Sequence, residues 1–191
     1  MLGIARQRAE VEWLESTAAG IAFEREFELA LMTGHAFQAL ATDDEVRSSL
    51  DAIRRALVPG GHFAFETRNP LQRAWESWDG ARLEAVDPSG RELLVWYEIE
   101  AVVGDVVTLT ETTGSRERVP LRVDPGSLRF LSVEALDGFL ADSAFAVEER
   151  FGGWQREPFR EDSEEIITVA RAVDTDDHPA VGGSWPEIPF L

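Results

Sequence analysis

The sequence predicts an α/β fold in which one helix crosses between two parallel strands. Phe27–Met32 is a short apolar run of the length that a buried strand needs, and His62–Thr67 is a second one. Between them, the pattern of apolar residues has the period of a helix. Two strands joined by such a crossover make a right-handed parallel βαβ unit. The stretch from Phe27 to Pro70 therefore organises the rest of the chain.

The helix of this unit is predicted from its cap, its apolar stripe and its stop signal. Thr42 is followed three residues later by Glu45, the spacing of a capping box. One apolar stripe toward a sheet is formed by Val46, Leu50, Ile53 and Leu57. Gly60 and Gly61 follow Pro59, and this combination ends a helix because glycine takes the left-handed cap conformation.

Residues 81–125 read as a small antiparallel sheet inserted after this unit. Turn residues at 87–90 and at Gly104-Asp105 separate apolar runs, which is typical of hairpins. Strands are predicted at residues 82–86, 93–102, 106–112 and 116–123. Two roles are open for this sheet: a cover over the substrate, or a structural or dimerising flap.

The remaining elements are shorter. We expect a strand at Val11–Leu14, a helix at Leu71–Trp78, and a second helix that Ser132 caps. The last two strands are predicted at Phe145–Arg150 and Ile166–Ala170. Residues 1–172 then form one domain, and residues 173–191 are expected to be a flexible tail because they lack periodicity.

Composition narrows the functional class. The chain has 191 residues and a formal charge of −18, which argues against nucleic acid and against anionic membrane surfaces as partners. It contains no cysteine, so thiolate metal sites and disulfides are excluded. No apolar run is long enough to span a bilayer, and no signal-peptide region follows Met1. We therefore expect a cytoplasmic protein.

Several segments, taken together in order, resemble the second half of class I S-adenosylmethionine-dependent methyltransferases. The resemblance lies in FELALMTGHAFQAL, in LVPGG before HFAFETRNP, and in the late segment LRFLSVEAL. It covers roughly Met1 to Ala172. It implies a Rossmann-like methyltransferase sheet, S-adenosylmethionine as cofactor, and a small molecule as the methyl acceptor.

One family feature does not occur: the GxGxG cofactor loop. The resemblance therefore implies an N-terminally truncated sheet that begins about one third of the way into the usual domain. In that arrangement Phe27–Met32 is left with a bare, apolar edge. Three outcomes are open: Val11–Leu14 pairs with this edge, two chains form a homodimer through it, or the true protein is longer.

Candidate site residues follow from the carboxyl ends of the strands, where open parallel sheets bind ligands. The cofactor-side candidates implied by the resemblance are Thr17, Ala18, Thr33, Gly34, His35 and Phe37. His35 is also the candidate general base, because histidine titrates near neutrality. Substrate candidates are Arg68, Asn69 and Trp154, and each has a structural alternative as a cap or a packing residue. No metal site is predicted, because the acidic run at 43–45 suits a helix start.

Two functions remain open at this point. The first is a methyltransferase-like enzyme whose activity is in doubt without the glycine-rich loop. The second is a non-catalytic remnant of that fold, acting as a dimeric or partner-binding module. A dinucleotide-binding oxidoreductase is a weaker third alternative because no dinucleotide fingerprint occurs.

Overall fold

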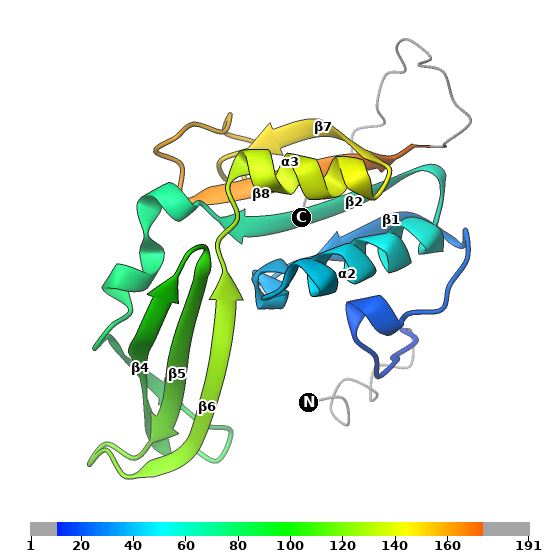
Figure 1. Ribbon diagram of the computed structural model, residues 1–191. Coiled ribbons are helices and arrows are strands. Elements are labelled where there is room, and N and C mark those ends of the chain that lie inside the picture. Colours follow the sequence, from blue (N-terminus) through cyan, green and yellow to red (C-terminus); the bar gives the residue numbers. More distant parts are fainter. Residues whose placement is uncertain (1–10, 174–191) are drawn as a thin grey trace.

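The strands form two separate four-stranded sheets in the computed structural model, which describes residues 11–173 (Figure 1). Sheet A has the order β1-β2-β8-β7. Its strands are β1 (Phe27–Met32), β2 (Leu57–Arg68), β8 (Glu165–Ala172) and β7 (Phe145–Phe151). β1 and β2 are parallel, whereas β8 runs antiparallel to both of its neighbours. Helix α2 (Asp43–Ala56) connects β1 to β2, so the predicted βαβ unit is confirmed.

Sheet B is the predicted antiparallel insertion. Its strands follow in chain order as β3 (Arg82–Val86), β4 (Glu92–Val103), β5 (Val106–Gly114) and β6 (Pro120–Arg129). The last strand extends beyond residue 125, the predicted end of the insertion, and leads directly toward helix α3 (Val133–Asp142). Figure 1 shows sheet B standing beside sheet A rather than continuing it.

The main core lies between sheet A and helices α2 and α3. Thr42 and Glu45 form both hydrogen bonds of the predicted capping box, at 3.2 and 2.9 Å. Ser132 caps α3 through the backbone N–H of Ala135. The buried side chains of α2, α3 and the strands form one cluster, which includes Val46, Leu50, Ile53, Phe63, Phe65, Leu136, Leu140, Phe145 and Ile166. Amphipathic helices laid on an apolar sheet face thus account for this layer.

Two predicted elements are wrong. Residues Val11–Leu14 form no strand, and Val11 and Leu14 are each more than half exposed. So short an apolar run has too little surface to bury, and it does not supply a partner for β1. The 1–10 segment of the predicted domain and the tail at 174–191 lie outside the described residues.

The predicted helix at Leu71–Trp78 is instead two 3-10 turns, η3 (Pro70–Gln72) and η4 (Ala74–Ser77). Arg73 between them has φ 45°, a left-handed conformation that an α-helix cannot contain. The break lets Trp75 pack edge-on against Phe130, with ring centroids 4.5 Å apart. Among the helices within residues 11–173, none has the length and apolar character needed to cross a membrane.

Candidate functional site

The loop after β1 places a histidine at the carboxyl end of the parallel pair. Gly34 and His35 both have left-handed backbone conformations, with φ 71° and 57°. His35 then precedes the short helix η2 (Ala36–Ala39). Its backbone N–H donates to Oε1 of Glu66 in β2, at 2.9 Å. The neighbouring strand therefore holds this sharp turn in place.

The imidazole of His35 is paired with Glu165, the first residue of β8. Nε2 lies 3.0 Å from each carboxylate oxygen of Glu165. Both side chains are about one quarter exposed, so a small molecule in solution has access to them. In neutral histidine this contact assigns the proton to Nε2, which leaves Nδ1 with the lone pair. The pair therefore has the arrangement of an oriented general base.

Arg68 lies beside this pair at the end of β2, directly opposite Glu165 in the strand register. Its guanidinium donates to Oε1 of Gln38 at 3.1 Å and lies over the ring of Trp78, 4.8 Å from the centroid. Burial lowers the pKa of Arg68, and the negative charges of Glu165 and Glu66 oppose this effect. Arg68 is thus a partly buried cation fixed by its neighbours.

Gln38 is a site-positioning residue that sequence reasoning missed. It is completely buried, and its amide donates to the carbonyl of Arg129 at 3.1 Å while its oxygen accepts from Arg68. A buried amide with partners on both sides is expensive to disrupt. The only signal in the sequence was a polar residue in an otherwise apolar stretch.

Sheet B also reaches this cluster, through Tyr97 of β4. Burial raises the pKa of the Tyr97 hydroxyl, and a hydrogen bond with Glu111 adds to the effect, whereas the charge of Arg68 lowers it.

Glu66 keeps its second carboxylate oxygen buried and without a hydrogen-bond partner. Within residues 11–173, no group of three or more histidine or carboxylate side chains is arranged to hold a metal ion.

Three other predicted residues lie in structural positions. Phe37 is 2% exposed and stacks on Phe65, with centroids 4.4 Å apart. Asn69 is 1% exposed and accepts from the N–H of Leu71, so it caps η3. Trp154 is 53% exposed in the loop after β7. The hydrogen-bond partners of His35 are instead Glu66 and Glu165, which are not among the site residues predicted from the sequence.

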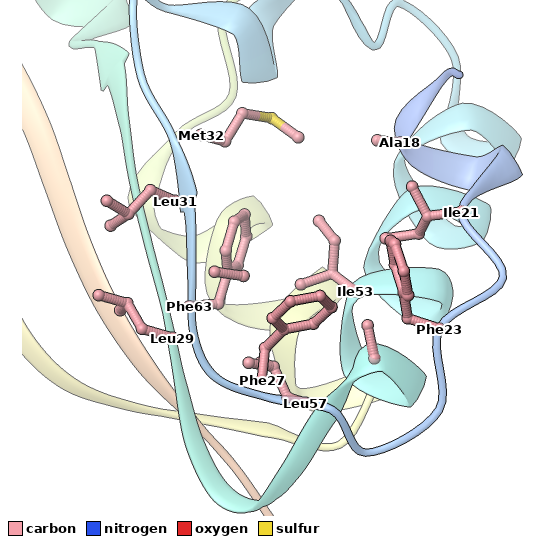
Figure 2. Close-up of a pocket in the computed structure, with 12 residues that line it drawn as sticks. Ala18, Ile21, Phe23, Phe27, Leu29, Leu31, Met32, Ile53, Leu57 and Phe63 are labelled. Atoms are coloured by element: carbon pink, nitrogen blue, oxygen red, sulfur yellow. The ribbon is translucent and has the colours of Figure 1, made fainter. Parts of the chain in front are cut away.

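The remaining cofactor-side candidates lie near a hollow beside β1 (Figure 2). Thr17 caps the short helix η1 (Ala18–Gly20) through the N–H of Gly20. Ala18 and Met32 both line the hollow, which has a volume of about 270 Å³, and Thr33 follows Met32 directly. Every lining residue is apolar, and Figure 2 shows Ile53 and Phe63 on its inner wall.

Solved structures with the same architecture identify the fold. A methyltransferase from Clostridium acetobutylicum that depends on S-adenosylmethionine superposes with a TM-score of 0.73 at 12% identity, over 90% of this chain and 70% of its own. The fold is that of the S-adenosylmethionine-dependent methyltransferases. No family model and no curated protein matches the sequence.

Two further neighbours of this methyltransferase fold are named for sugar substrates. KedS8 of Streptoalloteichus, a sugar N-methyltransferase, has a TM-score of 0.66 and 16% identity over 91% of this chain and 67% of its own. CalS10 of Micromonospora echinaspora, an amino pentose methyltransferase solved with bound S-adenosylmethionine, has a TM-score of 0.56 and 19% identity over 83% of this chain and 63% of its own. The chain thus spans about two thirds of the length of these enzymes.

Proposed function

We propose that this chain takes part in methyl transfer from S-adenosylmethionine to a small molecule. The observation that carries the proposal is the His35–Glu165 pair at the carboxyl end of β1, 3.0 Å apart, in a methyltransferase fold. In this mechanism Nδ1 of His35 takes the proton from the acceptor's nucleophile, and Glu165 stabilises the imidazolium that forms. Arg68 binds an electron-rich group of the acceptor through the part of its guanidinium that Gln38 leaves free.

The described residues fit only part of the cofactor. The apolar wall at Ala18 and Met32 suits a flat adenine ring, and Gly34 leaves its surroundings open, with no atom within 4 Å of an added Cβ. However, no carboxylate for the ribose and no charged pair for the methionine end lines the hollow. When bound, the cofactor supplies an electrophilic methyl group. The described lining therefore fits the adenine end of the cofactor and not its ribose or methionine end.

A calorimetric titration of the 191-residue chain with S-adenosylmethionine tests the proposal. We expect saturable binding with a Kd in the micromolar range, about −8 kcal/mol at 1 μM. Gly34→Ala is expected to weaken binding about tenfold, 1.4 kcal/mol, because the added methyl group obstructs a close backbone approach.

Gly90→Ala is the matched control for this titration. Gly90 also has a positive φ, 85°, and nothing within 4 Å of an added Cβ, but it lies in the β3–β4 turn. Both variants therefore carry a similar backbone strain, and only Gly34→Ala should change the affinity. If a folded chain shows no heat of binding with S-adenosylmethionine, the proposal is refuted. If both variants weaken binding equally, Gly34 is not part of the binding surface.

A second prediction concerns the general base. Because two structural neighbours are named for amino or N-methylated sugars, an acceptor screen by mass spectrometry begins with amino sugars. With an acceptor in hand, His35→Gln is expected to reduce kcat by about 10²- to 10⁴-fold while the cofactor Kd is unchanged. Glu165→Gln should cause a smaller loss and alter the pH profile of kcat. A parallel loss of cofactor affinity in His35→Gln would instead indicate a binding role.

The second candidate function is a non-catalytic partner-binding module that keeps the methyltransferase fold. It is favoured by the wholly apolar lining of the hollow beside β1. A folded chain that binds neither S-adenosylmethionine nor S-adenosylhomocysteine would support this alternative over the enzyme.

A further inference from the structure

The edge of sheet A at β1 is unlike the other sheet edges of residues 11–173. Its sequence, FELALM, has a single charge and no proline. Sheet proteins normally protect such edges with charges, prolines or bulges. β3 carries Arg82 and Glu84, β6 carries two prolines with Arg122 and Asp124, and β7 carries three charges. An unprotected edge of this kind is suited to pairing with another strand.

The outer edge of β1 has backbone groups that can pair with another strand. In residues 11–173 it pairs with β2 alone, which leaves the outer row of N–H and C=O groups unpaired. Leu29 is 42% exposed and Leu31 is 64% exposed. Figure 2 shows both side chains on the opposite side of the strand from Ile53. Two leucines thus stand exposed beside a free strand edge.

We propose that two copies of this chain pair through β1 as an antiparallel, two-fold symmetric dimer centred on Ala30. A two-fold axis perpendicular to the sheet keeps opposed side chains on one face, so only registers centred on a residue are allowed. Centring on Glu28 would oppose two carboxylates, which is destabilising. Centring on Ala30 places Glu28 opposite Met32 and Leu29 opposite Leu31. This register also uses the whole of the regular part of the strand.

The chemistry of the edge favours a second copy over a charged partner. In the register centred on Ala30, the two Leu29–Leu31 pairs form one four-leucine cluster on the face away from α2. The small side chain of Ala30 meets its own copy on the axis. Each chain carries a charge of −18, so repulsion between copies opposes the contact and salt screens it. The dimer should therefore tighten as ionic strength rises. This proposal does not depend on methyl transfer.

Sedimentation velocity on the full chain tests the dimer. We expect a species of twice the 21.2 kDa chain mass at tens of micromolar protein, with more dimer at higher salt. Leu31→Lys should raise the dimer Kd at least tenfold. Leu83→Lys is the matched control, because Leu83 is a 55% exposed leucine on β3, an edge strand of sheet B. Far-UV circular dichroism verifies that both variants fold.

Cross-linking tests the register, because the chain has no cysteine of its own. In the proposed register only residue 30 faces its own copy, within disulfide reach. Ala30→Cys should form a dimeric disulfide on oxidation, whereas Leu83→Cys should not. Three results would overturn the proposal. The first is a protein that stays monomeric at every concentration and salt, and the second is a dimer that Leu83→Lys disrupts but Leu31→Lys does not. The third is an Ala30→Cys dimer that fails to cross-link. If the protein is monomeric, the edge of β1 is available to pair with a different polypeptide segment instead.

Discussion

Replacing Phe63 by alanine is expected to lower the free energy of unfolding by about 3–5 kcal/mol. Phe63 is fully buried in β2. Its ring stacks on Phe65 at 4.8 Å and meets Phe145 of β7 at 6.0 Å, so it joins two strands beneath the helices. The alanine variant loses the transfer free energy of the ring and the contacts around it, and the neighbouring strands cannot fully close the cavity.

Denaturation in urea, at one fixed protein concentration, measures this loss. Trp154→Ala is the control because Trp154 is a large aromatic residue that is 53% exposed. Its substitution is expected to change the stability by less than about 0.5 kcal/mol. A Phe63→Ala variant within 1 kcal/mol of the parent would contradict the core described for sheet A.

Replacing Asn69 by aspartate is expected to destabilise the fold by about 3–5 kcal/mol, although the two side chains have the same shape. Nδ2 of Asn69 donates to the carbonyls of Glu161 and Ser163, at 2.9 and 2.8 Å, and the side chain is 1% exposed. In aspartate, a carboxylate oxygen would face both carbonyl oxygens in a buried site. An uncompensated buried charge has this cost.

Gln72→Glu makes the same chemical change on the surface. Nε2 of Gln72 donates to the same carbonyl, that of Glu161, at 2.9 Å, but this hydrogen bond is exposed. Water replaces the lost donor there, and the expected loss is below about 1 kcal/mol. Thermal unfolding of the two variants in parallel separates the effect of burial from the effect of replacing an amide by a carboxylate. Equal losses would mean that the loop at 161–163 is open to solvent in solution.

Local patterns explain why the βαβ unit was predictable. The capping box of Thr42 and Glu45 and the apolar stripe of α2 involve residues three or four apart. The same holds for the turns that separate β3, β4 and β5. The helix predicted at Leu71–Trp78 failed for the opposite reason: the packing of Trp75 on Phe130, 55 residues away, favours two broken turns over a regular helix.

The sequence by itself determined β1, most of α2 and the His62–Thr67 part of β2, that His35 follows a strand at its carboxyl end, and that the edge of β1 is apolar. It did not show that β2 already begins at Leu57, so that Pro59, Gly60 and Gly61 lie in the strand. Only the tertiary structure decided what surrounds His35. Glu165 is 130 residues away in sequence, and the link from Gln38 to Arg129 spans 91 residues. These contacts depend on the register in which β8 pairs with β2 and on how β6 reaches α3. Registers of this kind are set by the packing of the whole core, so no local pattern in the chain encodes them.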